Sequence, residues 1–360
     1  MAGTSASASS SRRGGVRHGP GEEDIHRERV HPQLRGRSVT PGFDFRLIPC
    51  PLCGSTGYKV LGRKKGDYYG RHAGDDVAQV VRCPGCSLIY ANPMPFPRKK
   101  DLAEIYNEDY TRTRMPSHFV PYREVKGDYV DIVEGRKRLA RIERIRGGKG
   151  LLLDIGCGPG NLLCVARDRG WDVLGLEIND ESARFARETN GLDVAAGEIV
   201  GYAESWAGRF DAVHFNQVLE HTYDPLGFLK AVRRVVRPDG VIFCGVPNED
   251  GAINRAAQLY FDVIGSGYTY MLSPTFPPYH VLGFSPRTIR AALEKTGFAV
   301  SGIDHVNYSV VDLASFGRGE VLKGLKSLVG VTARLFGRGH GLDVYGIPAS
   351  RYPVRHPLRP

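Results

Sequence analysis

The sequence predicts an α/β fold built on a sheet of seven strands, because short apolar runs alternate with segments of helical periodicity from residue 150 onward. The first of these runs ends in an acidic residue and a glycine-rich turn, and a helical segment follows at once. Units of this kind assemble a mostly parallel sheet with helices on both faces. Strands are expected at 150–155, 171–176, 192–195, 210–215, 241–246, 298–304 and 342–348, and helices near 161–169, 180–189, 225–235 and 286–296.

The turn after the first strand is rich in glycine, with Gly156, Gly158 and Gly160 directly behind Asp154. Glycine lets the backbone bend sharply and approach a ligand closely, and the helix start beyond the turn offers free N–H groups to that ligand. The second strand ends in Glu177, 21 residues after Gly156, where a nucleotide-binding α/β unit places its ribose-binding carboxylate. The segment therefore predicts a Rossmann-like nucleotide site.

The spacing of the glycines indicates which nucleotide is bound. The turn reads G-x-G-x-G, and Asn161 stands where a dinucleotide site has its third glycine, which speaks against NAD and for S-adenosylmethionine (SAM). At these residues the chain resembles the class I SAM-dependent methyltransferases. The resemblance continues in residues 210–221, 237–240 and 241–248 and implies a seven-stranded methyltransferase sheet. An α/β domain that binds another nucleotide is the alternative.

The resemblance also suggests which side chains hold SAM. Asp154 and the turn glycines are expected at the methionine end, and Glu177 is expected to accept both ribose hydroxyls. Glu198, after the third strand, is placed near the adenine. Asn216, at the end of the fourth strand, is placed near the methionyl end.

Methyl transfer is an in-line displacement that needs an aligned nucleophile and often a base that takes its proton. Glu220 and His221 follow the fourth strand at the mouth of the site, and the pKa of a histidine lies near working pH. His280, in an insertion rich in aromatic residues, is the rival base. We expect the catalytic group among these three, with His221 slightly favoured. Alternatively, His221 only orders its loop and His280 is a lid contact.

A divalent metal ion is a further hypothesis for the same segment. Gln217, Glu220 and His221 are spaced i, i+3, i+4 and would share one face of a helical turn. Ubiquinone-type O-methyltransferases and small-RNA 2′-O-methyltransferases have E-x-x-E-H at this place and bind a divalent ion. Gln217 replaces the first glutamate here, which weakens this interpretation because one carboxylate ligand is lost.

Four cysteines form two C-x-x-C pairs, Cys50 with Cys53 and Cys83 with Cys86, separated by 29 residues. Four thiolates suit a closed, tetrahedral zinc site with a structural role, and a hairpin near residues 66–74 has to bring the two pairs together. The surrounding sequence resembles bacterial methyltransferases that have an N-terminal zinc-binding segment. Members of that group act on small molecules and on cell-surface or natural-product precursors.

The composition suggests several segments. The expected order is a disordered tail at 1–44, a zinc-ribbon-like module at 45–95, a helical cap or linker at 96–149, the SAM-dependent domain at 150–348 with a substrate-side insertion at 249–281, and a tail at 349–360. The Tyr106–Tyr110 segment resembles one that caps the cofactor in related methyltransferases. Residues 320–336 have helical spacing, typical of a helix packed on the sheet or lying on a membrane surface.

The net charge of +10 is unevenly distributed. Residues 150–286 carry −7, whereas residues 46–149 and 287–360 carry +9 and +6. These basic flanks could meet an anionic substrate such as a nucleotide-sugar, a glycolipid or RNA, or they are only a solvated surface. No apolar run approaches the roughly 20 residues of a membrane span and no secretory signal is recognisable, so a cytoplasmic protein is expected.

The leading hypothesis is a methyltransferase that acts on a small-molecule or glycoconjugate acceptor. An RNA methyltransferase that grips phosphates with the zinc module and the basic flanks is the alternative. It is disfavoured because no RNA-binding fold is recognisable and because an aromatic insertion suits a closed pocket better than an open groove. A non-catalytic SAM-binding scaffold is the third hypothesis.

Overall fold

The structure is a computed structural model that describes residues 43–64, 79–97, 119–125, 130–265, 267–269, 272–275, 280–306 and 339–351. These residues belong to one compact unit, Val39–Pro360. The predicted helix at 99–106, the Tyr106–Tyr110 segment and the helical pattern at 320–336 lie outside the described residues.

The central sheet confirms the predicted α/β fold. Its seven strands run in the order β13-β14-β10-β9-β6-β7-β8, and only the pairs that involve β14 are antiparallel. The strands are β6 Leu151–Ile155, β7 Asp172–Glu177, β8 Val194–Ala196, β9 Phe210–Asn216, β10 Val236–Pro247, β13 Phe298–Val306 and β14 Gly341–Pro348. The parallel strands β6, β7, β8 and β9 therefore end at one edge of the sheet, which is where α/β folds bind ligands.

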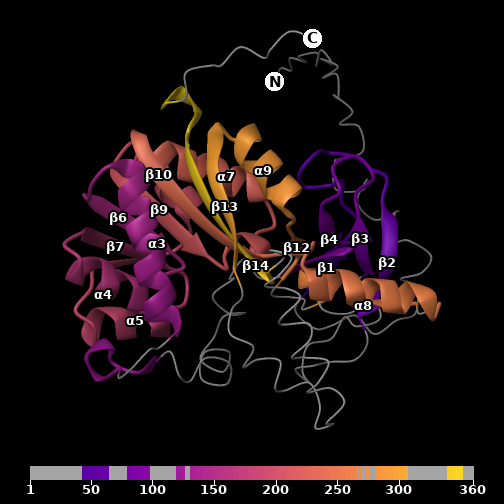
Figure 1. Cartoon of the computed structure of the whole chain (residues 1–360), viewed down its shortest axis with the longest axis horizontal. Coiled ribbons are helices and arrows are strands. Elements are labelled where there is room, and N and C mark those ends of the chain that lie inside the picture. The colour runs from indigo at the N-terminus through magenta and orange to yellow at the C-terminus, as the bar shows by residue number, and fades with distance from the viewer. Residues whose placement is uncertain are drawn as a thin grey trace, which may run out of the picture. The chain divides into compact units, whose positions relative to one another are not determined.

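Helices cover both faces of this sheet (Figure 1). One face carries α3 Val130–Arg146, α4 Asn161–Asp168 and α5 Asp180–Glu188, whose apolar residues form one buried cluster. The other carries α6 Ile199–Tyr202, α7 Pro225–Val235 and α9 Pro286–Lys295, which form a second cluster. The predicted helices near 225–235 and 286–296 form, and each begins at a capping side chain. Ser285 forms a capping box with Thr288 ahead of Pro286, and the Asp224 side chain accepts a hydrogen bond from the Gly227 amide at 2.8 Å.

Two segments differ from the sequence-based expectation. Strand β10 begins at Val236 rather than at 241, and its pairing with β9 is irregular between Val236 and Val241. The aromatic insertion after β10 contains a helix, α8 Ala252–Val263, and leads into two short strands, β11 Tyr268–Thr269 and β12 Leu282–Gly283. In the described part of the chain, no helix is long and apolar enough to cross a bilayer.

The cysteine-rich segment folds as a set of short strands. These are β1 Phe43–Arg46, β2 Lys59–Lys64, β3 Gln79–Arg82, β4 Ile89–Ala91 and β5 Met94–Pro97. Strands β2 and β3 pair antiparallel, which confirms the hairpin between the two cysteine pairs, although its turn lies outside the described residues. A sheet of five strands has the order β11-β2-β3-β4-β12, so both of its edge strands come from the segment that follows β10 (Figure 1).

Candidate active site

The glycine turn at the end of β6 has the conformation that its sequence predicts. Gly156, Gly158 and Gly160 have φ angles of 69°, 54° and 86°, in the left-handed region that favours glycine. A Cβ atom at Gly160 would collide with the Leu192 side chain, so that glycine also lets α5 and the following loop pack closely. Apart from its chain neighbours, no described residue has an atom within 4 Å of the Cβ position of Gly158, so these residues leave room above the turn for a ligand.

Glu177, at the end of β7, is joined to this turn. Its Oε2 accepts a hydrogen bond from the Gly158 backbone N–H at 2.7 Å, and its Oε1 accepts one from the Asn179 backbone N–H at 2.8 Å. Burial raises the pKa of this carboxyl against the effect of those amides. Each carboxylate oxygen has a second lone pair, so both oxygens can also accept a hydroxyl. The end of β7 and the glycine turn are thus joined through the Glu177 carboxylate.

Asp154 lies at the last-but-one position of β6 and is 4% exposed. Its Oδ1 lies 2.6 Å from Nδ1 of His214, the residue opposite it on the neighbouring strand β9. The His214 ring in turn stacks on Phe243, with centroids 4.5 Å apart and an interplanar angle of 6°. Asp154 is therefore held by a buried histidine that the sequence analysis did not single out.

The remaining predicted cofactor residues lie at the same edge of the sheet. Asn216 ends β9, and its Oδ1 is buried without a hydrogen-bond partner among the described residues. A Cβ atom at Gly245 of β10 would collide with that oxygen, so Asn216 needs glycine as its neighbour. Glu198 is exposed at the N-terminus of α6, one residue after Gly197, whose amide donates to the Glu177 carbonyl at 3.0 Å.

The three predicted catalytic side chains gather at one point. Glu220 and His221 belong to a 3₁₀ turn, η4 Leu219–His221, just past β9, whereas His280 lies two residues before β12. The rings of His221 and His280 meet edge to face with centroids 4.5 Å apart, and His221 Nε2 lies 4.0 Å from Glu220 Oε1. One ligand atom of each residue lies within 4.8 Å of the others. The two rival bases are therefore members of one cluster.

Burial governs the charges in this cluster. Glu220 is fully buried, neither of its oxygens has a hydrogen-bond partner among the described residues, and burial raises its pKa to about 8. Burial, with a smaller contribution from His221, lowers the pKa of His280 well below its usual value. At neutral pH the carboxyl is therefore largely protonated and the His280 imidazole is neutral. A neutral imidazole can accept a proton.

The arrangement predicted for a metal site through Gln217 does not form. Gln217 has a φ angle of 55° and precedes the 3₁₀ turn, so it is not on a helical face with Glu220 and His221. Its backbone N–H donates to the Gly245 carbonyl at 2.8 Å. His280 stands beside the other two instead, and its contribution could not be read from local spacing.

Glu249 is a second buried carboxylate that the sequence analysis missed. Burial raises its pKa to about 7, its Oε1 accepts a hydrogen bond from the Ser273 amide at 2.9 Å, and its charge contributes to the raised pKa of Glu220. No local motif marks Glu249, because the groups that it interacts with, the Ser273 amide and the Glu220 carboxyl, are distant from it in sequence.

The four predicted zinc ligands come together in two matching turns. Cys50 Sγ lies 3.5 Å from Cys86 Sγ, and Cys53 Sγ lies 3.4 Å from Cys83 Sγ. A tetrahedral zinc with bonds of about 2.3 Å holds its sulfurs about 3.8 Å apart, so the group fits that ion after a small adjustment. All four ligand atoms lie within 4.8 Å of one another.

The backbone around each cysteine pair follows one pattern. The Cys50 amide donates to the Ser55 carbonyl and the Cys83 amide to the Leu88 carbonyl. In both turns the amide four residues on then donates back to the first cysteine's carbonyl. The residues at that fourth position, Gly54 and Ser87, have φ angles of 76° and 73°. Two equivalent turns thus present two sulfurs each to a common point.

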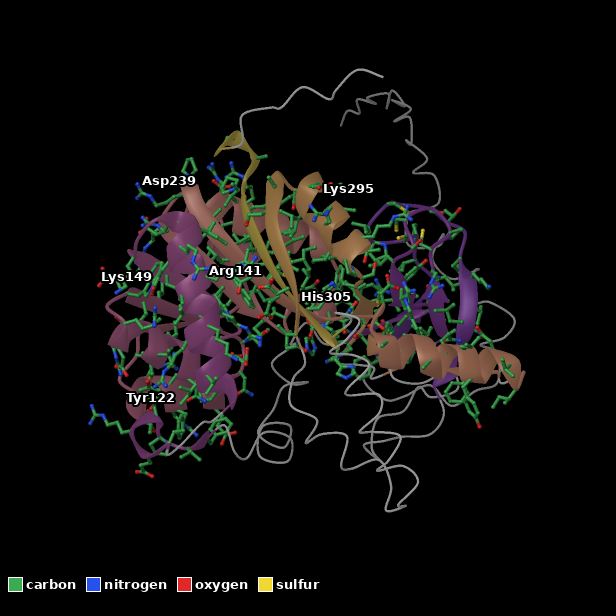
Figure 2. The ribbon with its side chains drawn as sticks, viewed as in Figure 1. Tyr122, Arg141, Lys149, Asp239, Lys295 and His305 are labelled. Carbon is green, nitrogen blue, oxygen red and sulfur yellow. The ribbon has the colours of Figure 1, made fainter. Side chains whose placement is uncertain are left out.

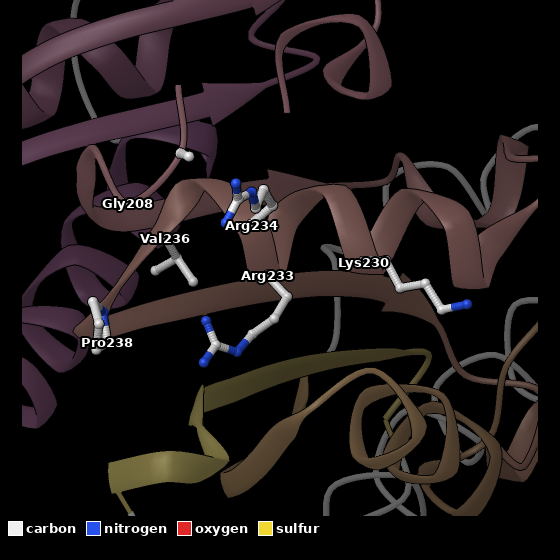
Figure 3. A pocket seen from close by; sticks show the side chains of 7 residues that line it. Gly208, Lys230, Arg233, Arg234, Val236 and Pro238 are labelled. Atoms are coloured by element: carbon white, nitrogen blue, oxygen red, sulfur yellow. The ribbon is translucent and has the colours of Figure 1, made fainter. Parts of the chain in front are cut away.

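A basic pocket of about 440 Å³ lies at the end of the central sheet opposite the glycine turn (Figure 3). It is formed where α7 ends and β10 begins, and Lys230, Arg233 and Arg234 contribute its positive side chains. Arg234 is paired with Glu204 at 2.8 Å. Because the cofactor turn and the catalytic cluster follow the carboxyl ends of the strands, this pocket is not part of the candidate active site.

Comparison with known proteins agrees with this geometry. Residues 129–301 match the family model of the methyltransferase domain. Over 199 residues the chain is 30% identical to a ubiquinone biosynthesis O-methyltransferase of Pseudomonas aeruginosa (strain UCBPP-PA14). The matched region covers 54% of this chain and 80% of that protein. The protein of the same name in Bordetella avium (strain 197N) is 28% identical over 168 residues, covering 44% of this chain and 66% of the relative.

A crystal structure of a SAM-dependent methyltransferase from Archaeoglobus fulgidus superposes with a TM-score of 0.41 at 18% identity, covering 60% of this chain and 93% of that one. The matched family domain and the 30% identical relative place this chain in a known class: it belongs to the SAM-dependent methyltransferases. The cysteine-rich module at residues 43–97 precedes the matched domain.

Proposed function

We propose that this methyltransferase acts on a small-molecule or glycoconjugate acceptor, which reaches the methyl group next to Glu220, His221 and His280. The observation that carries the proposal is the position of this cluster, directly past β9 and Asn216, where the methyl-bearing end of SAM is expected. The relatives named for ubiquinone biosynthesis support a small acceptor. A cytoplasmic location, expected from the sequence, fits reduced thiols in the cysteine module.

SAM supplies an electrophilic methyl group on its sulfonium. Among the described residues, the space above Gly158 is open and Asn216 Oδ1 has no hydrogen-bond partner, and both features fit a ligand along the turn. Asp154 and the turn glycines would hold its methionine part, Glu177 its ribose and Glu198 its adenine. SAM would donate its methyl group to the acceptor's nucleophile with cleavage of the carbon–sulfur bond, and His221 or His280 would take the acceptor's proton. The products are the methylated acceptor, S-adenosylhomocysteine and one proton.

Replacing Glu177 tests the cofactor assignment. A charge-assisted contact to the ribose contributes roughly 1.5–3 kcal/mol, so Glu177→Ala is expected to weaken SAM binding on the order of tenfold or more. Calorimetric titration with SAM measures this change. Glu188→Ala, an exposed carboxylate on α5, is the matched control and should leave the affinity unchanged. Equal affinities for both variants, or binding of NAD in place of SAM, would contradict the assignment.

The cysteine cluster is proposed to hold one structural zinc ion. A closed site with four thiolates has no open position for catalysis, and zinc binding is coupled to folding of such turns. Metal analysis is expected to find one zinc per chain in the wild type and a clear loss in Cys83→Ser. Cys164→Ala, a buried cysteine outside the cluster, should retain the metal. Equal zinc in wild type and Cys83→Ser would show that these cysteines do not bind it.

A screen for the acceptor decides between the substrate classes. Incubation with SAM and metabolite fractions should yield a small product that gains the mass of one methyl group. A salt-dependent shift of the protein with RNA would instead favour the alternative of an RNA acceptor. SAM binding without turnover on either class would favour a non-catalytic scaffold.

A further inference from the structure

The cysteine module and the catalytic domain share a sheet rather than a flexible connection. In the five-stranded sheet, β2, β3 and β4 come from the module, whereas β11 and β12 come from the segment between β10 and α9. Strand β12 pairs antiparallel with β4, with Leu282 opposite Tyr90 and Gly283 opposite Ile89. One edge of the module is therefore built by the chain segment that carries His280.

Val281 links the module directly to the catalytic turn. Its carbonyl accepts a hydrogen bond from the Ala91 amide at 3.0 Å, and its amide donates to the Glu220 carbonyl at 2.9 Å. Val281 is completely buried, so both hydrogen bonds are shielded from water. His280 directly precedes this doubly held residue. The place of its ring against His221 therefore follows from the position of β4.

Strand β4 follows directly from the second cysteine turn, which contains Cys83 and Cys86. Cys83 donates its amide to the carbonyl of Leu88, and β4 starts at the next residue. Leu88, Tyr90 and Val281 are fully buried and belong to the same apolar cluster as α9 of the catalytic domain. A displacement of the turn that holds Cys83 and Cys86 is thus transmitted to β4 without an intervening loop.

We propose that the cysteine module is a positioning element of the active site: by pairing with residues 281–283, β4 holds His280 against His221 and Glu220. The metal-bound turns fix β4 in register, and β4 fixes the acceptor side of the site. This role rests on the proposed zinc site and on the proposed function of the histidine cluster. The glycine turn and Glu177, which hold SAM, are not part of this connection.

Hydrogen–deuterium exchange of the full chain tests the proposal, with and without a zinc chelator. Removal of zinc is expected to accelerate exchange in peptides that cover residues 280–283 by at least about tenfold, whereas β6 at residues 151–155 stays protected. SAM affinity, measured in the same samples, should change less than about twofold. Unchanged protection at 280–283 after zinc loss would overturn the proposal. An equal acceleration in β6 would also overturn it, since the module would then be a general stabiliser.

A variant that spares the cysteines gives an independent reading. Leu88→Ala opens a cavity beneath the start of β4 and is expected to accelerate exchange at 280–283 in the zinc-loaded chain. Lys295→Met is the matched control. Lys295 lies on α9 (Figure 2). The substitution removes another contact between the same parts, the hydrogen bond from Lys295 Nζ to the Leu52 carbonyl at 2.8 Å, and should leave 280–283 protected.

These experiments distinguish a failure of the proposed function from a failure of the proposed positioning role. A chain that contains no zinc or does not bind SAM contradicts the proposed function itself. A chain that binds both, but in which neither zinc loss nor Leu88→Ala changes residues 280–283, contradicts only the positioning role.

Discussion

Replacing the catalytic base by alanine is expected to lower turnover by about 10²–10⁴-fold while SAM still binds, because a positioned base contributes on that scale. The sequence slightly favours His221, which follows β9 closely. The structure places His280 in ring contact with it, and burial lowers the pKa of His280, which keeps this imidazole neutral but opposes the imidazolium that proton transfer would form. His221→Ala and His280→Ala therefore have to be measured side by side on an identified acceptor.

The variant that removes the base should lower kcat, and the other should mainly raise the KM of the acceptor. His305→Ala, a histidine on β13 outside the cluster, is the control for non-specific effects. Near wild-type turnover in both single variants would show that neither histidine is the base. Catalysis would then rest on alignment or on Glu220.

A chelator separates a base from a metal ligand in the same cluster. Glu220, His221 and His280 offer one carboxylate and two imidazoles within 4.8 Å, a donor set that also suits a divalent ion. If the residues act as base and support, a chelator that leaves the cysteine-bound zinc in place should not change the activity. Loss of activity that an added divalent ion restores would instead assign the cluster to metal binding.

The local part of the fold was predictable because its signals lie close together in sequence. The acidic end of β7 and the glycine turn fall within one strand–helix–strand unit, so spacing alone indicated that Glu177 meets the turn. The starts of α7 and α9 follow from Asp224 and Ser285, whose side chains satisfy the first amides of each helix. The two C-x-x-C pairs likewise predicted that the four cysteines form one cluster.

The site residues that escaped prediction depend on contacts between distant segments. His214 meets Asp154 only because β9 pairs with β6 in a register that no local pattern encodes. The sequence names His280 as a candidate base but not its contact with Glu220, which forms because β12 pairs with the cysteine module, nearly 200 residues earlier in the chain. Strand pairing over such separations is set by the packing of whole faces, and periodicity within one segment does not reveal it.

A buried ion pair between α3 and the central sheet carries the largest expected effect on stability. Arg138 donates to both carboxylate oxygens of Asp343 on β14, at 2.9 and 3.1 Å, and the side chains are only 7% and 5% exposed. The Arg138 guanidinium also lies over the Phe243 ring, 5.0 Å from its centroid. Burial raises the pKa of Asp343 in spite of Arg138, so desolvation outweighs the attraction between the partners.

Asp343→Asn is therefore expected to lower the free energy of unfolding by about 3–5 kcal/mol, because it leaves the Arg138 charge buried without its counter-charge. Urea denaturation followed by circular dichroism measures the change. The double variant Arg138→Met, Asp343→Leu should recover most of this loss, since it removes both desolvated charges and keeps the apolar volume. Glu204→Gln, which breaks the exposed pair with Arg234, is the control and should leave the unfolding midpoint unchanged. If Asp343→Asn unfolds at the same urea concentration as the wild type, the pair does not hold α3 on the sheet.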